Sequence, residues 1–577
     1  MAGQESLAGV FSILVEERVI GVERAPKRPR SSKQEQYISR CRSRPSLETG
    51  SSSSSSNSQS NQTCSRDTST NMHLYSTVLM AAAGAAAQSA FDLSDLPAFI
   101  KSSSSTNWPT LLTIGQKIWN DPEVGLNETH AHDRIVSYFS SVGGWTVSPS
   151  AYPGLPTAFK AEFDNRPAGF TGDLPTVGFL AEYDALLGIG HACGHNLIAL
   201  NGISAAKFAS EALAHYNIPG RIIVIGTPDE ENAAGKFKLN NLGAFNGSDV
   251  WLMAHPTTTS AIQPMNARLN YFARFVGSTH SEAVSKAYDA LDIVQNLSGL
   301  PGTSSSAVGI ENVGLYATNI VQTIIQLGVA GLSLDTVNDT VSSILDSTYP
   351  NVTFSAATDA NGVALTILGP GGHASEATKS PLTLSVNTYK ALKDTSGVSF
   401  YLPGNTSITE LDITIDFRTR YTADLNSVAN FASAALGTLP AGISHDVQYP
   451  ALEVAPFLGQ AFIDIVGTPD YGLTNFPSST FAPASTDASW VQDPVLDPAT
   501  HELKSVAKAV LHANYGICTN PSGAGCPFNH EPLFKGLANT DFAYEQTEIV
   551  ARAEAQLAIE LLADPSQMAQ AVAIVSK

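Results

Sequence analysis

A strand, a helix and a second strand follow one another in the amino-terminal half of the chain. "TVGFLAEYDAL" (176–186) and "RIIVIGTPDE" (221–230) are apolar runs of strand length, and "LIALNGISAAKFASEALAHY" (197–216) between them has the length and spacing of a helix. This order is typical of a parallel crossover unit, in which polar groups after the strands meet at one edge of the sheet. We therefore expect an α/β sheet whose functional residues follow its strands.

The composition excludes two classes of partner. A chain of 577 residues with 43% hydrophobic and 15% charged residues is long enough for two or more globular domains, and it contains no apolar run of membrane-spanning length. Its formal net charge of -20 leaves no basic stripe to gather phosphates. We therefore expect neither nucleic acid nor a membrane as a partner.

The first 71 residues differ from the rest of the chain. They contain ten Lys or Arg, a run of six Ser and almost no apolar periodicity, which is a disordered composition. "MHLYSTVLMAAAGAAAQSA" then has the apolar length of a secretory signal and small residues for cleavage. Because such signals act from the amino terminus, we predict that translation starts at Met72, that 1–71 is an artefact of the gene model, that 72–90 is a signal peptide and that the protein is secreted. The alternative is a cytosolic protein with a disordered head and an Ala-rich helix.

Glycosylation sequons and cysteines fit an exported protein. Six Asn-x-Ser/Thr sequons follow the predicted signal, at Asn127, Asn246, Asn296, Asn338, Asn351 and Asn405. Three cysteines remain after Met72, and Cys518 and Cys526 are spaced so that a disulfide can close a short loop. Cys193 is then unpaired, which leaves a buried apolar residue or a metal ligand as its usual roles.

An approximate internal repeat lies between the two parts of the α/β pattern. The segment "LNYFARFVGSTHSEAVSKAYDALDIV" resembles "VALTILGPGGHASEATKSPLTLSVNTYKAL", which lies about 93 residues later. A further strand and helix follow each segment. We predict two copies of a small α+β domain, at 264–357 and 358–450. They would be inserted into a catalytic domain formed by 91–263 and 451–577.

Three polarisable side chains, those of His191, Cys193 and His195, lie within five positions of "GIGHACGHNLIAL". They can be interpreted as a thiol and imidazole pair for nucleophilic catalysis, as metal ligands or as core residues. No clear third member supports the catalytic thiol. Burying all three without a function would be costly.

Further metal-binding residue types follow the other predicted strands. Adjacent carboxylates, Glu230 and Glu231, end a hydrophobic run, and on an extended chain they would point to different sides, one toward a metal ion and one toward the reacting water. His255 ends "WLMAH", and His530 lies in "CPFNHEP". A solvated turn or a structural histidine would explain each of these residues alone. Together, five residues provide the donors that suit a zinc-like ion: Cys193, His195, Glu231, His255 and His530.

The ordered motifs resemble those of a known family. "IWNDPEVGLNETHAHDRI", "GLPTAFKAEF", "FLAEYDALLGIGHACGHNLI", "GTPDEENAAGK", "MAHP", "ASTDASW" and "NHEP" are similar to motifs of the aminoacylase and carboxypeptidase family of dinuclear metallopeptidases, in particular its amidohydrolase branch of aminoacylase-1-like proteins. The resemblance covers about residues 105–577. It implies a mixed-sheet α/β catalytic domain with an inserted α+β lid, which here is duplicated.

The resemblance also implies roles for individual residues. Cys193 would bridge two divalent ions, and Glu230 would be the general base that takes a proton from the attacking water. Asp184 would orient a ligand, whereas Asp487 matches a family motif without an assigned role. Asp229 stands where the family usually has Ala, and an extra carboxylate there would alter metal affinity or the pKa of the base.

The two lid copies are predicted to supply different residues to the active site. Family members pair through a single lid, so that each site takes a His and an Asn from the partner and an Arg from its own lid. We predict that the first copy supplies His280 and Asn319 within the same chain, while the second supplies Arg418 for the substrate carboxylate. The alternative gives the role of His280 to His373 of the second copy. Either arrangement would allow a monomer to work.

The sequence therefore predicts a secreted hydrolase with two divalent ions, zinc first and manganese or cobalt as alternatives. Its substrates would be N-acyl amino acids or small dipeptides, with a dipeptidase or carboxypeptidase proper as the alternative. A catalytically silent binding protein is the alternative from another class. The presence of Glu230 and of all the ligands speaks against it.

Overall fold

The computed structural model describes residues 91–295, 308–311 (backbone only), 320–349, 351–373, 380–482, 484–498 and 503–573. They all belong to one compact unit, Ala86–Lys577. The predicted extension (1–71) and signal peptide (72–90) lie outside the described residues, and both stay predictions.

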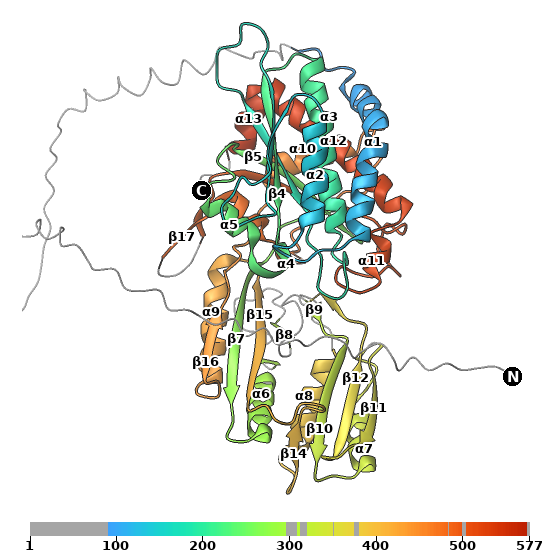
Figure 1. Cartoon of the computed structure of the whole chain (residues 1–577), viewed down its shortest axis with the longest axis vertical. Coiled ribbons are helices and arrows are strands. Elements are labelled where there is room, and N and C mark those ends of the chain that lie inside the picture. The colour runs from blue at the N-terminus through green and yellow to red at the C-terminus, as the bar shows by residue number, and fades with distance from the viewer. Residues whose placement is uncertain are drawn as a thin grey trace, which may run out of the picture. The chain divides into compact units, whose positions relative to one another are not determined.

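A mixed seven-stranded sheet is the centre of the catalytic domain (Figure 1). Its order is β1-β2-β4-β3-β5-β19-β6, in which β3, β4, β5 and β19 are parallel and the edge strands are antiparallel. The strands are β1 (Trp145–Ser148), β2 (Lys160–Asn165), β3 (Thr176–Glu182), β4 (Gly220–Thr227), β5 (Val250–Thr257), β6 (Ala261–Ile262) and β19 (Ala509–Gly516). The predicted parallel crossover, β3 to β4 through α3 (His195–His215), is confirmed.

Helices complete the catalytic domain. They are α1 (Leu96–Asn120), α2 (Thr129–Ser141), α3, α4 (Glu230–Ala233), α5 (Gly235–Asn241), α10 (Pro456–Val466), α11 (Phe534–Leu537), α12 (Asp541–Ala563) and α13 (Pro565–Val572). Of these, α2, α3, α5, α10 and α12 contact strands of the sheet. A 3₁₀ turn, η1 (Asp487–Gln492), and a small hairpin of β17 (Val495–Leu496) and β18 (Leu503–Ser505) complete the domain. None of the described helices is long and apolar enough to cross a membrane.

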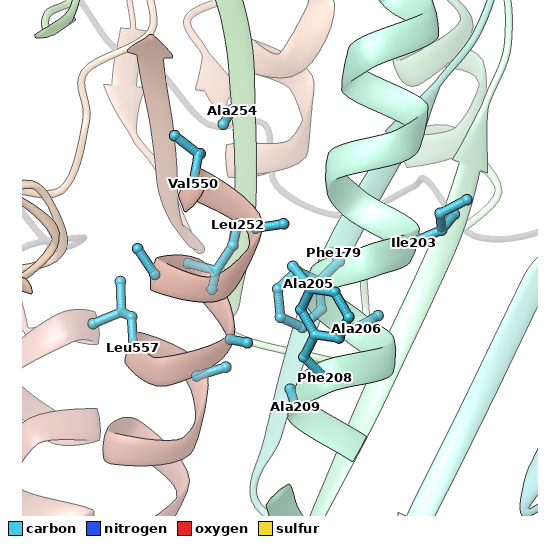
Figure 2. Packing of buried hydrophobic residues seen from close by; sticks show 14 of the residues in the cluster. Phe179, Ile203, Ala205, Ala206, Phe208, Ala209, Leu252, Ala254, Val550 and Leu557 are labelled. Atoms are coloured by element: carbon cyan, nitrogen blue, oxygen red, sulfur yellow. The ribbon is translucent and has the colours of Figure 1, made fainter. Parts of the chain in front are cut away.

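The core of the catalytic domain lies where α3 and α12 cover the sheet. Figure 2 shows Ala205, Ala206 and Ala209 of α3 close to Phe179 of β3. On the neighbouring strand and on α12, Leu252 and Val550 are also buried. Small side chains let the helix lie close to the sheet, and burial of apolar surface at about 25 cal/mol per Å² stabilises the contact. This packing fixes the strand ends that carry the candidate site.

The lid consists of two four-stranded antiparallel sheets (Figure 1). The outer lid unit contains β7 (Ala267–Val276), α6 (His280–Gln295), β8 (Val308–Glu311), β15 (Glu410–Thr419), α9 (Thr422–Leu436) and β16 (Gly442–His445). The inner lid unit contains β10 (Ile324–Ala330), α7 (Leu334–Ile344), β11 (Thr353–Thr358), β12 (Val363–Leu368), α8 (Pro381–Leu392) and β14 (Ser399–Tyr401). A two-stranded ladder of β9 (Ile320–Val321) and β13 (Gly372–His373) lies beside them.

Both lid units have the same topology. The outer sheet has the order β16-β7-β15-β8, and the inner sheet, read from its other end, has the order β14-β10-β12-β11. If the strands of each unit are numbered along the chain, both orders are fourth, first, third, second. The units share one hydrophobic core, in which the rings of Tyr288 on α6 and Tyr389 on α8 lie 5.2 Å apart. The inner unit is thus inserted between β8 and β15 of the outer unit.

This arrangement differs from the tandem copies that the sequence predicted. The elements of the repeat occur in the expected order, but the boundary at 357/358 falls inside β11, in its hairpin with β12. Strands from 264–357 and 358–450 occur together in each sheet. β7 pairs with β15 rather than with the second strand of its own segment. Which strands pair depends on contacts between distant segments, and the repeat in the sequence does not show these contacts.

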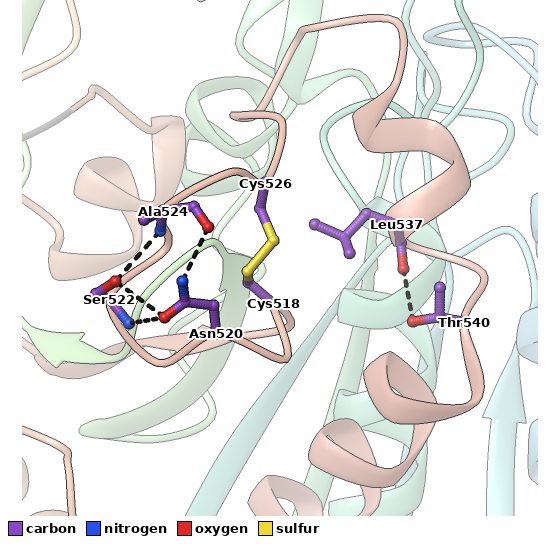
Figure 3. Close-up of a disulfide and its surroundings, with 7 residues drawn as sticks. All are labelled: Cys518, Asn520, Ser522, Ala524, Cys526, Leu537 and Thr540. Carbon is purple, nitrogen blue, oxygen red and sulfur yellow. Dashed lines mark hydrogen bonds between the residues drawn. A yellow bond between two sulfur atoms is a disulfide. The ribbon is translucent and has the colours of Figure 1, made fainter.

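The predicted disulfide between Cys518 and Cys526 is present (Figure 3). Within its loop, Asn520 Nδ2 donates to the carbonyl of Ala524 (2.9 Å), and Asn520 Oδ1 accepts from the N–H of Ser522 (3.1 Å). The loop leads directly to the segment that carries His530.

Candidate metal centre and active site

Cys193 lies in the turn that joins β3 to α3. It is the free cysteine of the described residues and is buried. Gly194, which caps α3, has a φ of 86°, and a Cβ there would lie 2.6 Å from the ring of Pro256. The glycine therefore allows the thiol and the first residue of the helix, His195, to approach the end of β5.

Glu230 and Glu231 begin α4 directly after β4. Asp229 before them has a φ of 64°, which Asp tolerates better than most residues. Its N–H donates to Glu128 Oε1 (2.9 Å), and its carboxylate pairs with Lys238 (2.9 Å). The Glu pair therefore occupies a fixed helical turn rather than the extended chain that the sequence predicted.

The two carboxylates still face different groups. Glu231 Oε1 lies 3.5 Å from His195 Nε2 and 3.5 Å from His530 Nε2. Glu230 Oε1 accepts from the N–H of Asp487 (3.4 Å) and lines the cavity of the site. Burial, and then Glu182 and other nearby carboxylates, raise the pKa of Glu230 well above its ordinary value.

His255 and His530 reach the site from two other segments. His255 lies on β5, where its Nδ1 is 2.9 Å from the carbonyl of Pro256 and its Nε2 is 3.5 Å from Cys193 Sγ. The N–H of His530 donates to the carbonyl of Ala192 (2.9 Å). Asn529 Nδ2 donates to the carbonyls of Cys193 and Pro256 (both 3.1 Å) and so ties the two segments together.

All five predicted metal ligands lie together, in two groups that share Cys193. Cys193, His195 and His255 form one group, and Cys193, Glu231 and His530 form the other, with the ligand atoms of each group within 4.8 Å of one another. Thiolate, imidazole and carboxylate donors at these distances suit zinc or a similar divalent ion. A third group consists of Glu182, His195 and Glu230, so two of the three candidate ion sites among the described residues share the sulfur atom of Cys193.

The electrostatics of the cluster fit bound cations. His195 Nδ1 is 3.0 Å from Asp184 Oδ1, which places the proton of a neutral ring on Nδ1. The lone pair of Nε2 then faces Glu182 Oε1 at 3.1 Å, and a second proton or a cation is needed between them. Burial and Glu231 raise the pKa of the Cys193 thiol, but the surrounding imidazoles lower it to a net value of about 5. A thiolate among carboxylates is the environment that a divalent cation neutralises.

Asp184 holds two ligands with one carboxylate. Besides its contact with His195, its Oδ2 accepts from the N–H of Glu231 (2.9 Å). Burial raises the pKa of Asp184 to about 6, while His195 opposes this shift. The orienting role that the sequence predicted for Asp184 agrees with this geometry.

Three residues of the lid line the cavity that Cys193 and Glu230 also line: His373, Arg418 and Arg268 on β7. Arg418 on β15 and His373 on β13 both line it and are both buried. The rings of His373 and His530 lie 4.4 Å apart. Burial, and then His530 and Arg418, lower the pKa of His373 well below its ordinary value. One chain thus brings residues of its own lid to the candidate site.

His280 is not brought to the site. It begins α6, where its Nδ1 lies 2.6 Å from the carbonyl of Ile408 and its Nε2 accepts from the N–H of Leu402 (3.0 Å). Both ring nitrogens therefore bind the main chain. His280 is not one of the described residues that line the cavity. The prediction that His280 acts on the substrate is not supported, because the pairing of β7 with β15 leaves it against the inner unit. Asn319 lies outside the described residues.

Comparisons with known proteins find similarity over part of the chain. No family model matches the chain. Human Xaa-Arg dipeptidase is 43% identical over 157 residues, which are 26% of this chain and 36% of the relative. The chain is therefore similar, over about a quarter of its length, to members of a family of peptidases and amide hydrolases. A component of the p-aminobenzoyl-glutamate hydrolase of Escherichia coli is 30% identical over 160 residues, 25% of this chain and 31% of the relative.

The matched segments span about a third of the length of these relatives. Among solved structures, a Bacillus subtilis protein described as a dinuclear metal binding peptidase is similar over 80% of this chain and 98% of its own, with 14% identity and a TM-score of 0.39.

A buried ionic network beneath Glu230 was missed by the sequence analysis. Lys236 Nζ donates to Glu182 and to Asp487 Oδ1 (2.6 Å), and its N–H donates to Asp487 Oδ2 (2.8 Å). Asp487, whose motif had no assigned role, thus connects this network to Glu230 through its own N–H. Lys236 stands in the same quoted motif as the Glu pair, but nothing in the spacing distinguishes it from a solvated lysine.

Two further buried histidines flank the ligands. His191 belongs to neither ligand group, and burial lowers its pKa to about 3. His512 on β19 was also missed, and its ring lies 5.9 Å from that of His255. Burial lowers the pKa of His512 to about 3 as well, so both rings are neutral at pH 7. Among the described residues, neither belongs to a ligand group or lines the cavity.

Proposed function

We propose that the chain is a metal-dependent hydrolase that cleaves the amide bond of small dipeptides or N-acyl amino acids. The observation that carries this proposal is the position of Cys193, which belongs to both ligand groups and lines a cavity together with Glu230. A general base next to two ion sites is an arrangement that can activate water for hydrolysis of an amide bond.

The ligands divide into two sets. His195 and His255 would hold one ion, Glu231 and His530 the other, and Cys193 both. Divalent ions supply Lewis acidity, which polarises a carbonyl group and lowers the pKa of water. Glu230 takes the proton of the attacking water and returns it to the leaving amine, while the N–H of Asp487 holds its carboxylate in place.

The lid binds the substrate on the other side of the cavity. Arg418, held by Asp416 (Nε–Oδ2 2.9 Å), presents a guanidinium for the substrate carboxylate. His373 takes the role that the sequence assigned to His280 and faces the substrate carbonyl. Because His373 and Arg418 belong to the chain that carries the ligands, we propose that a monomer is complete.

The relatives support this class of substrate. The names of the human and Escherichia coli proteins describe a dipeptidase and the hydrolase of an aminobenzoyl-glutamate amide. Both name a small molecule with a carboxyl-terminal amino acid. A binding protein without activity stays the alternative from another class, and the intact Glu230 and ligand set argue against it.

Hydrolysis of a panel of dipeptides and N-acetyl amino acids tests the proposal. We expect activity with zinc, manganese or cobalt, loss of activity with a chelator and recovery when the metal is returned. Glu230→Gln is the matched variant, because it keeps the shape of the side chain and all ligands but removes the base. We expect it to bind metal and to lower kcat by about 10²- to 10⁴-fold. Activity that survives metal removal would contradict the proposal.

Secretion from a start at Met72 stays part of the proposal. The disulfide between Cys518 and Cys526 supports it, since such bonds persist in oxidising compartments. Four sequon asparagines, Asn127, Asn246, Asn351 and Asn405, are exposed, as glycosylation requires. Asn296 lies outside the described residues. Expression of the full chain and fractionation of the culture test it: recovery of the protein in the cytosol, without glycans, would contradict it.

A further inference from the structure

Two buried arginines face each other across the lid strands that border the cavity. Arg268 on β7 is the direct partner of Arg418 on β15 in the ladder, and both side chains line the cavity. They are 4% and 1% exposed. Like charges directly opposite each other on a sheet are destabilising, and burial increases this cost. A compensating group is therefore required.

Asp416 is the carboxylate that contacts both guanidinium groups, and Asp446 and Glu230 also attract Arg268 electrostatically. Its Oδ2 binds Arg418 through Nε (2.9 Å) and a terminal nitrogen (2.8 Å), whereas its Oδ1 lies 3.6 Å from Arg268 Nε. The next carboxylate, Asp446, accepts from the N–H (2.9 Å) and Nδ2 (2.7 Å) of Asn270. One carboxylate thus stands in contact with two guanidinium groups.

Arg268 is held in place by an aromatic ring. Its guanidinium lies over the ring of Tyr449, 5.2 Å from the centroid, and the Tyr449 hydroxyl donates to the main-chain carbonyl of Glu230 (3.1 Å). This chain of contacts fixes the distance between Arg268 and the segment of the general base. A fixed, planar donor is suited to recognise a carboxylate.

We propose that Arg268 and Arg418 together select substrates whose carboxyl-terminal residue is acidic, glutamate or aspartate. The inference rests on the proposed function and names its substrate class. One guanidinium binds the α-carboxylate, and the other binds the side-chain carboxylate. Among the described residues that line the cavity, the one carboxylate is Glu230, which is engaged as the base, so a basic side chain finds no partner there.

A purely structural role for Arg268, packing on Tyr449, makes a different prediction. Loss of that packing would affect all substrates alike, whereas loss of a specific carboxylate contact affects acidic substrates alone. The pair Ala-Glu and Ala-Gln separates the two, because the side chains have the same size and differ in charge. For the wild type with bound metal we expect kcat/KM to be at least about tenfold higher for Ala-Glu than for Ala-Gln and higher than for Ala-Arg.

Arg268→Met should lower kcat/KM for Ala-Glu by about 10- to 100-fold and change that for Ala-Gln by less than about threefold. Arg268→Lys should keep part of the preference. Arg274→Met is the matched control on the same strand, since Arg274 is exposed and pairs with Asp412 (2.7 Å) away from the cavity. Equal losses for both peptides in Arg268→Met, or a wild type that prefers Ala-Gln or Ala-Arg, would overturn the proposal.

A binding measurement keeps the proposal separate from the hydrolysis itself. If no peptide is cleaved, the proposed function fails, but the paired arginines can still be tested by calorimetry of the metal-loaded protein with glutarate and butyrate. We expect glutarate to bind at least about tenfold more tightly than butyrate to the wild type, and not to Arg268→Met. Equal affinities for the wild type would overturn the inference whatever the activity.

Discussion

One carboxylate, that of Asp184, binds His195 Nδ1 (3.0 Å) and the N–H of Glu231 (2.9 Å), and these two residues belong to different ligand groups. Asp184 thereby sets the position of a ligand on each side of Cys193. Removing its charge should loosen both groups while the ligands themselves remain.

We predict that Asp184→Asn weakens metal binding by about 10- to 100-fold. At saturating metal its kcat should recover more completely than that of Glu230→Gln, because the base is intact. Titration of the metal-free protein with zinc, followed by calorimetry and by activity, checks this. Unchanged affinity would show that Asp184 does not orient the ligands.

Replacement of the two lid histidines, His373 and His280, should have different effects on turnover and stability. We predict that His373→Ala lowers kcat by about 100-fold with little change in stability, because His373 lines the cavity. His280→Ala should leave kcat within about threefold and lower the free energy of unfolding by about 1–3 kcal/mol, because two main-chain partners are lost. Each variant is the control for the other. Turnover lost in His280→Ala and kept in His373→Ala would reverse the assignment.

Glu554 gives a pH prediction away from the metal centre. It is fully buried on α12, where burial raises its pKa to about 8 and the amide of Asn201, oriented to satisfy both partners, donates to its Oε2 (2.7 Å). Its unfolded pKa is about 4.3, so between these values the folded state holds the proton more tightly and stability falls as pH rises.

We therefore predict that the wild type loses about 3–4 kcal/mol relative to Glu554→Gln between pH 5 and pH 8. Chemical unfolding of both proteins at each pH measures the difference. Glu545→Gln is the matched control, since Glu545 is exposed on the same helix and should show no such pH-dependent difference. A constant difference between wild type and Glu554→Gln across this range would contradict the prediction.

Features that depend on short stretches of sequence were predicted correctly. The crossover of β3, α3 and β4 follows from apolar runs of strand and helix length. Residue type and position near the end of an apolar run indicated four of the predicted ligands, Cys193, His195, Glu231 and His255. The disulfide follows from the short spacing of Cys518 and Cys526.

Long-range pairing was beyond the sequence patterns. The repeat revealed the elements of the lid, but the exchange of strands between its halves places His373 at the cavity and His280 against main chain. The same exchange brings Arg268 opposite Arg418, although they are 150 positions apart. A single arginine within a strand carries no signal that distinguishes a binding residue from a surface one.

Metal stoichiometry tests the central claim most directly, because both ion sites depend on the sulfur of Cys193. The measurement is the number of zinc ions bound per chain after dialysis, by elemental analysis, for the wild type and for Cys193→Ala with the same folded circular dichroism spectrum. The account predicts about two ions per wild-type chain and less than about one in the variant. Two ions retained by Cys193→Ala, or none bound by the wild type, would contradict it.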